Sequence, residues 1–416
     1  MGITMKNDHF KKNMNMLSVT LLFSIIVAGN IAAEYACLAD DNTAFFCNDL
    51  VTASCRLNGS MTCISGVGLL IGADDITIDG AGFILTGDRE NLSCGGDEAS
   101  FSKHSGVVNK EYDNVTIENL EITNFCTGIV IGEYPPVVDN MTLLGCTIHD
   151  CGKSADCTHG IHIIGANNCT ITGNNIYNID GQGVGGGCGG GGNGIFMYGV
   201  NRDRGNQNTI TCNNLSYNIK SGFFMKKQCM YNNISNNIAT ENYEGGIVLM
   251  CVQSNYNVIE GNNASRSGSG IVIGGSNNTI RYNSALNNRY FGIKMSRNDG
   301  SYNNELYGNI ACGNGYVDIK TCGHECYGNH GDDNTCNTTS NYDDTGTTGC
   351  TYSCGTQESK PEGDLNGDGK VTPADAVVAL QMAVSGECSE DADVSGDHTV
   401  TSLDALMILQ MAAEEA

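Results

Sequence analysis

The sequence predicts a mainly β protein whose short strands wind into a parallel β-helix, followed by a small α-helical domain. Three observations predict this fold. A glycine followed by alternating apolar residues recurs along the chain, as in coils that bury one face by stacking. Tryptophan is absent and only 4 prolines accompany 55 glycines in 416 residues, which suits strands joined by tight turns. Near the C-terminus, two acidic loops each precede a short apolar helix.

The N-terminus has the pattern of a secretory signal peptide, which we place at residues 1–33. Lys11 and Lys12 precede an apolar run over residues 17–28, and Ala32 and Ala33 supply small residues for cleavage. A bilayer-spanning helix needs about 20 apolar residues. We therefore expect a secreted, extracellular protein with no membrane span.

The formal net charge is −25. A surface this acidic repels nucleic acid and anionic lipid, and it favours cation binding. We expect no nucleic-acid partner.

All 21 cysteines follow the signal, which in an exported protein indicates disulfides. They cluster in two segments that we predict to cap the rod, residues 34–63 and residues 321–355. For the segment from Thr321 to His330 a zinc site is the alternative, with Cys322, His324, Cys326 and His330 as ligands. Secretion and the lack of CxxC pairs favour a disulfide cap. The odd cysteine count leaves at least one thiol over, and Cys388 is our candidate.

The repeat occupies residues 64–320. Its first strand begins at a glycine and continues with alternating apolar residues; examples start at Gly128, Gly160, Gly194, Gly222, Gly246, Gly270 and Gly292. Its second strand has the form N-x-T-I or close to it, and a third short segment follows. Three alternating strands per coil bury their apolar face only when coils stack. A parallel β-helix results, in which Ile271 belongs to the inward column.

Asparagines recur after the second strand, at Asn174, Asn213, Asn236, Asn262, Asn283 and Asn309. Two interpretations are open: stacked amides that hydrogen-bond as a ladder, or residues that tolerate the left-handed backbone of a corner. The repeats resemble right-handed parallel β-helices of surface proteins, polysaccharide lyases and pectin-degrading hydrolases. The segment Ile76–Gly87 is similar to the opening coil of such domains. The resemblance implies the fold and leaves the activity open.

A linker at residues 356–363 leads to the C-terminal domain, residues 364–416. Two segments 29 residues apart carry the spacing of a calcium loop, in which oxygens at positions 1, 3, 5, 7, 9 and 12 converge on one ion. The first set is Asp364, Asn366, Asp368, Lys370 (through its carbonyl), Thr372 and Asp375. The second is Asp393, Ser395, Asp397, Thr399 (through its carbonyl), Thr401 and Asp404. We predict Ca²⁺ as the cofactor.

This tandem of loop and helix, with Asp at position 12, resembles a type I dockerin, close to those on archaeal surface proteins. The resemblance implies a cohesin as the partner. It assigns cohesin selection to loop positions 10 and 11, which here are Pro373, Ala374, Ser402 and Leu403. The near-twofold sequence symmetry implies two binding orientations.

Catalytic candidates gather in two insertions, residues 150–160 and 180–194, which follow the same strand in adjacent coils. The resulting lobe brings Asp150, Asp156, His159, His162 and Asp180 together. With Lys153 as a cation, such groups can break a glycosidic bond by hydrolysis or elimination. The paired-Asp, GHG and RxK motifs of pectinase hydrolases are missing from the sequence. The carboxylates are alternatively turn residues, and His162 is alternatively an outward strand residue without a task.

The prediction as a whole is a secreted β-helix rod that a dockerin attaches to a cohesin-bearing assembly or cell surface. Two functions compete for the rod. It is either a carbohydrate-binding or surface module, or a polysaccharide-degrading hydrolase or lyase.

Overall fold

A computed structural model gives the structure of the protein. It describes residues 35–90, 94, 101–133, 137–152, 158–181, 190–200, 205–250, 253–296, 300–355, 361–366, 369–385, 388–389, 391–396 and 399–414. The predicted signal peptide, the linker residues 356–360 and the candidates Asp156, Asp368 and Asp397 lie outside these residues. None of the described helices is long and apolar enough to cross a membrane.

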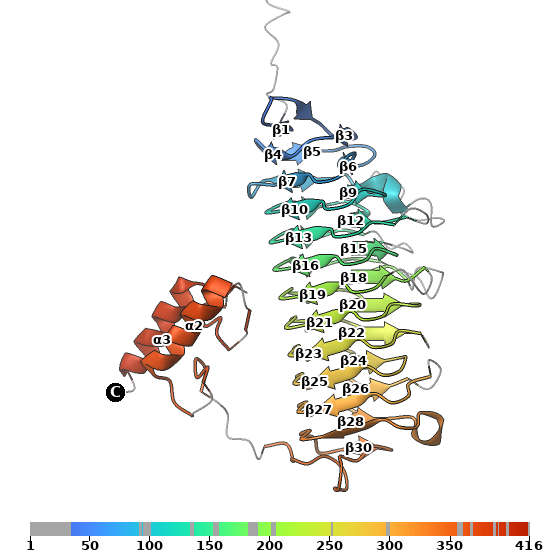
Figure 1. Ribbon diagram of the computed structural model, residues 1–416, viewed down its shortest axis with the longest axis vertical. Coiled ribbons are helices and arrows are strands. Elements are labelled where there is room, and N and C mark those ends of the chain that lie inside the picture. The colour runs from blue at the N-terminus through green and yellow to red at the C-terminus, as the bar shows by residue number, and fades with distance from the viewer. Residues whose placement is uncertain are drawn as a thin grey trace, which may run out of the picture. The chain divides into compact units, whose positions relative to one another are not determined.

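Stacked coils form the rod, and each coil contributes one strand to two long sheets (Figure 1). Sheet A is parallel except at its first two strands, where β1 pairs antiparallel with β2 and with β4. Its strands, in spatial order, are β2 (Ala44–Phe45), β1 (Cys37–Ala39), β4 (Cys55–Leu57), β7 (Thr77–Asp79), β10 (Thr116–Glu118), β13 (Thr142–Leu144), β16 (Thr170–Thr172), β19 (Thr209–Thr211), β21 (Asn233–Ser235), β23 (Val258–Glu260), β25 (Thr279–Arg281), β27 (Glu305–Tyr307) and β29 (His330–Asp332).

Sheet B contains the glycine-led strands that the repeat predicts. In spatial order these are β3 (Leu50–Val51), β6 (Leu69–Ile71), β9 (Ser105–Asn109), β12 (Thr127–Ile131), β15 (His159–Ile164), β18 (Asn193–Tyr198), β20 (Ser221–Lys226), β22 (Gly245–Met250), β24 (Ser269–Ile273), β26 (Phe291–Met295), β28 (Val317–Lys320) and β30 (Thr339–Ser340). Two short 3-10 turns, η1 (Phe101–His104) and η3 (Gly323–Glu325), interrupt the coils.

The third strand is present only in the first coils. Sheet C consists of β5 (Met61–Thr62), β8 (Ile84–Thr86), β11 (Glu121–Thr123), β14 (Thr147–His149) and β17 (Asn175–Tyr177). From Asn214 onward the third segment makes isolated parallel bridges instead of strands. Buried asparagines five residues apart, such as Asn213 and Asn218, flank this segment. Their side-chain amides take over hydrogen bonds that a strand would otherwise make.

The core is the inward column that the alternation predicts. Ile247, Ile271 and Ile293 follow one another in register on sheet B and are fully buried. Ile271 therefore points inward, as expected. Because each coil contributes one residue to this column, the apolar surface is buried by the neighbouring coils.

Asparagines form the predicted amide ladder, with one correction. The ladder passes through Asn174, Asn213, Asn237, Asn262, Asn283 and Asn309, each Nδ2 donating to the next Oδ1 at 2.9–3.0 Å. Asn236, which the sequence analysis placed in this row, instead takes the exposed left-handed corner with φ of 53°. The prediction was therefore wrong by one residue there, since the buried amide belongs to its neighbour Asn237.

Disulfides close both ends of the rod, as the cysteine clusters predict. Cys37 pairs with Cys55 and Cys47 with Cys63 at the N-terminal end. At the other end the pairs are Cys312–Cys354, Cys322–Cys326 and Cys336–Cys350. The zinc alternative fails, because two of its four proposed ligands are bonded to each other.

Cys388 is not the unpaired thiol that we expected, since it forms a disulfide with Cys212. Free thiols among the described residues are instead buried in the rod, at Cys146, Cys151 and Cys169. Burial raises the pKa of Cys151 to about 12, so this thiol stays protonated and unreactive.

The C-terminal domain contains two helices of equal length, α2 (Pro373–Ser385) and α3 (Ser402–Glu414). A small core of alanines with Ile408 and Val371 joins them. This core is separate from that of the rod.

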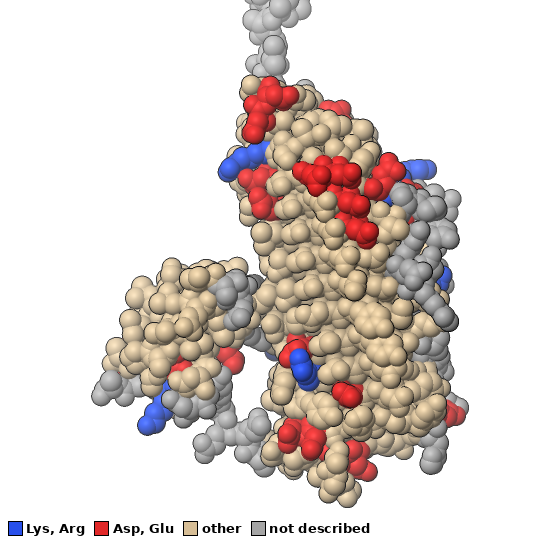
Figure 2. Space-filling view, viewed as in Figure 1, with Lys and Arg blue, Asp and Glu red and all other residues tan. Residues whose placement is uncertain are grey.

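Charge is unevenly spread over the surface. On the face shown in Figure 2, acidic side chains gather over the N-terminal coils, and few Lys or Arg side chains are visible. Most of the described basic residues that pair do so with a carboxylate of another coil, as Arg281 does with Glu260 at 2.8 Å.

Candidate functional site

The first predicted calcium loop is held closed by its last residue, Asp375. Its Oδ1 accepts hydrogen bonds from the backbone N–H groups of Leu365 and Asn366, at 2.8 and 2.9 Å. Its Oδ2 accepts from both the N–H and the hydroxyl of Thr372, at 2.8 Å. Asp364, the first residue of the loop, is buried and accepts from the N–H of Gly369 at 2.9 Å. Gly369 has φ of 83°, the left-handed conformation that the sharp turn requires.

The second loop repeats this arrangement 29 residues later. Asp404 Oδ1 accepts from the N–H of Ser395 at 2.9 Å, and Oδ2 accepts from the N–H and hydroxyl of Thr401 at 2.8 and 2.9 Å. Asp393, the first residue, accepts from the hydroxyl of Ser395 and the N–H of Gly396. The two loops therefore share one fold despite the weaker ligand Ser395.

The residues present fit a hard cation such as calcium. Asp364, Asp375 and Asp404 are fully buried carboxylates, and an ionised carboxylate is costly to bury unless a cation or hydrogen bonds compensate. Within the described ranges no three His, Cys, Asp or Glu side chains converge on one point, and the central acids Asp368 and Asp397 lie outside those ranges.

Hydrogen bonds keep both closing carboxylates ionised. Burial alone raises the pKa of Asp375, but the hydrogen bonds from Asn366 and Thr372 outweigh it, so its pKa lies below the ordinary value. The pKa of Asp404 is lowered in the same way, with burial opposed by bonds from Ser395 and Thr401. Charged carboxylates are the form that binds calcium.

The four predicted cohesin-selecting residues begin the two helices. Pro373, Ala374, Ser402 and Leu403 are all exposed, at corresponding positions of α2 and α3. Behind them, each helix exposes an apolar row: Val377, Leu380 and Val384 on α2, and Leu406 and Leu409 on α3. Side chains this apolar and this exposed on a small domain indicate a protein-binding surface.

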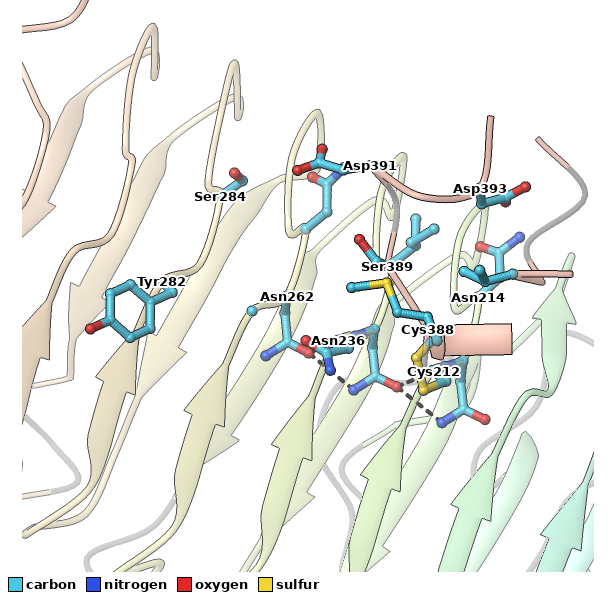
Figure 3. A pocket seen from close by; sticks show the side chains of 17 residues that line it. Cys212, Asn214, Asn236, Asn262, Tyr282, Ser284, Cys388, Ser389, Asp391 and Asp393 are labelled. Atoms are coloured by element: carbon cyan, nitrogen blue, oxygen red, sulfur yellow. Dashed lines mark hydrogen bonds between the residues drawn. A yellow bond between two sulfur atoms is a disulfide. The ribbon is translucent and has the colours of Figure 1, made fainter. Parts of the chain in front are cut away.

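The Cys212–Cys388 disulfide borders a cavity of about 440 Å³ (Figure 3). Its lining is mostly polar and includes Asn236, Asn262 and Asp393. Asp393 is also the first ligand position of the second calcium loop. The bond is the one described covalent link between this loop's segment and the rod, apart from the main chain itself.

The two insertions leave and re-enter the rod side by side, as predicted. They begin after the paired strands β14 and β17 and end at the paired strands β15 and β18. The Asp180 N–H donates to the Cys151 carbonyl at 2.8 Å, and the Thr158 hydroxyl donates to the Asp180 carbonyl at 3.1 Å. Residues 153–157 and 182–189, with Lys153 and Asp156, lie outside the described residues.

The structure brings His159 and His162 together on the outer face of sheet B. Their rings meet edge to face at 5.0 Å, and His159 stacks on Phe196 at 4.5 Å. Both side chains are buried. Burial lowers the pKa of His162 to about 3, and burial together with the neighbouring His162 lowers the pKa of His159 well below its ordinary value. Both imidazoles are therefore neutral at physiological pH.

The described partner of the Asp150 carboxylate is a different histidine, outside this pair. Asp150 sits at a corner with φ of 49° and pairs instead with Nδ1 of His149 at 2.7 Å. His149 lies between two carboxylates, since its Nε2 also faces Glu121 at 3.1 Å.

Sequence reasoning missed two groups of residues. One is this His149 cluster, which Tyr177 completes by stacking on the His149 ring at 5.1 Å. The other is a set of exposed tyrosines at coil corners, including Tyr231 and Tyr256, which stack at 5.2 Å. The sequence does contain a pattern for the second group, because these tyrosines recur at corners of successive repeats.

Family comparisons match both parts of the chain. A model of the right-handed beta helix region matches residues 81–190 and 159–342. A model of the dockerin type I domain matches residues 362–411. No curated protein matches the sequence significantly.

Solved structures similar to this chain include proteins that act on polysaccharides. The periplasmic alginate epimerase AlgG is 14% identical, with a TM-score of 0.46 over 74% of this chain and 79% of that one. The pectate lyase Pel9A is 15% identical, with a TM-score of 0.48 over 71% and 74%. The A-module of the Azotobacter vinelandii mannuronan C-5 epimerase AlgE6 is 16% identical, with a TM-score of 0.42 over 74% and 87%. Likeness at this level does not indicate a shared activity.

Proposed function

Because the chain belongs to the right-handed beta helix family and ends in a type I dockerin domain, we propose that it couples a carbohydrate to a cohesin. The dockerin, loaded with calcium, binds the cohesin of a scaffold or surface protein. The rod presents a carbohydrate-binding surface. The protein is thereby held in a cellulosome-type assembly or at a cell surface.

The observation that carries the proposal is the repeated closure of the two acidic loops. In each loop, one buried aspartate at position 12 accepts hydrogen bonds from both ends of its loop. Calcium bound between the loop oxygens would neutralise the buried carboxylates and fix the start of each helix. Asp364, Asn366, Thr372 and Asp375 would hold one ion together with Asp368, and the corresponding residues of the second loop would hold the other.

Extracellular placement has independent support. The described residues contain several disulfides, including those at both ends of the rod, and such bonds persist in oxidising compartments. Dockerin domains belong to extracellular proteins, which agrees with this redox environment.

Binding is a better supported role for the rod than catalysis. A general acid or base must reach its partner within hydrogen-bond distance, and the described candidates divide between two clusters. His159 and His162 lie on sheet B, whereas Asp150 pairs with His149. If the rod were a hydrolase or lyase, Asp150→Asn, His159→Ala and Asp180→Asn should each lower polysaccharide cleavage by roughly 10²–10⁴-fold.

The test of the proposal is capture of the full-length mature chain on an immobilised type I cohesin. We expect capture in calcium and release in a chelator, and we expect Asp364→Ala combined with Asp393→Ala to abolish it. Asp391→Ala is the matched control, because Asp391 is an exposed acid two residues before the loop. Capture that persists in chelator, or that the control reduces as much as the double variant, would refute the calcium-dependent mode.

A further inference from the structure

Seven side chains near the C-terminal end of the rod form one connected cluster, which we call the aromatic–cationic surface. It consists of Tyr243, Arg289, Tyr290, Phe291, Lys294, Tyr316 and Lys320. Arg289 lies over the Tyr243 ring at 5.1 Å and beside that of Tyr290 at 6.0 Å. Lys294 and Lys320 both lie over the Phe291 ring, at 4.9 and 5.2 Å.

Aromatic contacts connect the two halves of the cluster. Tyr290 and Tyr316, from neighbouring coils, lie 5.2 Å apart, and Phe291 meets Tyr316 edge to face at 5.7 Å. The coil of β24 lies between Tyr243 and Arg289, and there Gly268, which has no side chain, donates its N–H to the Asn242 carbonyl. Tyr243 and Tyr316 are 62% and 65% exposed, so their rings present apolar faces to solvent.

The cations of this surface differ from three others on the rod, which pair with carboxylates. Arg266 pairs with Glu241, Arg281 with Glu260, and Lys220 with Glu244, each across neighbouring coils. Among the described residues, no carboxylate lies within ion-pair distance of Arg289, Lys294 or Lys320. The chain has a net charge of −25, yet these three cations gather at one place and can bind an anionic ligand.

The arrangement is also unfavourable for folding. Lys294 and Lys320 face each other in register on β26 and β28, and like charges directly opposite each other destabilise a sheet. Asp318, two residues before Lys320, has its carboxylate engaged elsewhere. It is buried, and its carboxylate accepts hydrogen bonds from Asn314 and Thr338. Two lysines held opposite each other over the Phe291 ring, with no described carboxylate paired to either, are placed to share one anionic ligand.

We propose that the aromatic–cationic surface binds an acidic polysaccharide of the uronic-acid class, along the axis of the rod. This inference rests on the carbohydrate-binding role proposed above and specifies its ligand. The apolar face of a pyranose ring packs on the exposed tyrosines, and uronate carboxylates pair with the lysines and Arg289. Coils repeat every ~4.8 Å, a spacing close to one sugar unit, so successive sugars meet successive coils. A single-stranded nucleic acid also stacks and carries charge, so it is a comparison ligand in the test.

The test compares two polymers and two double variants of the full-length, calcium-loaded chain. Polygalacturonate is the charged probe, and its fully methyl-esterified form has the same backbone without the charge. Lys294→Gln/Lys320→Gln removes two cations from the surface. The control, Arg266→Gln/Arg281→Gln, removes two cations that already pair with carboxylates. Tyr316→Ala tests the stacking separately.

We expect the lysine double variant to bind polygalacturonate roughly tenfold more weakly, as two exposed charge contacts contribute. The control should change affinity less than about twofold, and added salt should weaken wild-type binding. The lysine variant should melt close to wild type, because the lost like-charge repulsion offsets the loss of the two cation–π contacts with Phe291. A purely structural role for the lysines predicts a lower melting temperature and unchanged affinity.

Three results would overturn the inference: equal affinity for the methyl-esterified polymer, equal effects of the two double variants, or single-stranded DNA binding of equal strength through the same lysines. Binding of a neutral polysaccharide without binding of polygalacturonate would refute the ligand class alone. A rod that binds no carbohydrate would also refute the carbohydrate part of the proposed function. Cohesin capture is read separately and is independent of all these outcomes.

Discussion

Removing one buried amide of the asparagine ladder should destabilise the rod strongly. Asn237 is 1% exposed, and its Oδ1 accepts from the N–H and Nδ2 of Asn213, both at 3.0 Å. Its Nδ2 donates to the carbonyls of Ile210 and Ser235 and to Asn262 Oδ1. Asn237→Ala removes all five hydrogen bonds and leaves the buried Asn213 N–H without its acceptor. With a net ~0.5–1.5 kcal/mol for each bond, the cost is about 2.5–7.5 kcal/mol.

Asn236→Ala is the matched control, because Asn236 is the adjacent, exposed residue with φ of 53°. Alanine there only loses the tolerance of asparagine for the left-handed region, at about 1 kcal/mol. Native-state hydrogen exchange of the amides in β19, β21 and β23 measures the difference locally. We expect exchange to accelerate about a hundredfold or more in Asn237→Ala, and about fivefold in the control. Equal acceleration in the two variants would show that the ladder contributes no net stability.

Three further predictions follow from the same structure. Ile271→Asp places an unpaired charge in the apolar column and should unfold the stack at room temperature, checked as loss of β-type circular dichroism; wild-type melting would contradict this. His159 and His162 have lowered folded pKa values, so the unfolded chain binds more protons below about pH 6.5. As the pH is lowered from about 6 to 4, the free energy of unfolding should therefore fall by about 3 kcal/mol per pH unit. In His159→Gln/His162→Gln the denaturation midpoint should depend less on pH. Peptide mapping without reductant should recover Cys212 linked to Cys388, whereas a free thiol at Cys388 would contradict the pairing.

The repeat pattern was sufficient to predict the rod because each strand is defined by residues next to one another. Gly270 and the alternating Ile271 and Ile273 indicate a strand and its inward face without knowledge of distant contacts. The ladder needed finer alignment. Its asparagine follows the buried isoleucine of sheet A by three residues, as Asn237 follows Ile234. In the doublet Asn236–Asn237, the corner and the ladder positions both hold asparagine, so composition alone did not separate them.

The sequence alone does not predict which distant segments contact each other. Cys212 and Cys388 are 176 residues apart, and nothing local to either cysteine indicates the other. Tyr243 and Arg289 likewise belong to different coils and meet only in the folded rod. For the candidate catalytic residues, the sequence placed Asp150 and His159 on adjacent segments. Their side chains diverge because Asp150 occupies a corner before the insertion, while His159 begins a strand after it.

The central claim is that one chain couples a carbohydrate on its rod to a cohesin on its dockerin through calcium. A bridging measurement tests it most directly: fluorescent polygalacturonate is passed over a cohesin-coated surface in the presence of the full-length protein. The account predicts that the polymer is retained only when both protein and calcium are present, and that a chelator releases polymer and protein together. Retention of the protein without the polymer would refute the proposed carbohydrate binding. Retention of both in chelator would contradict calcium-dependent docking.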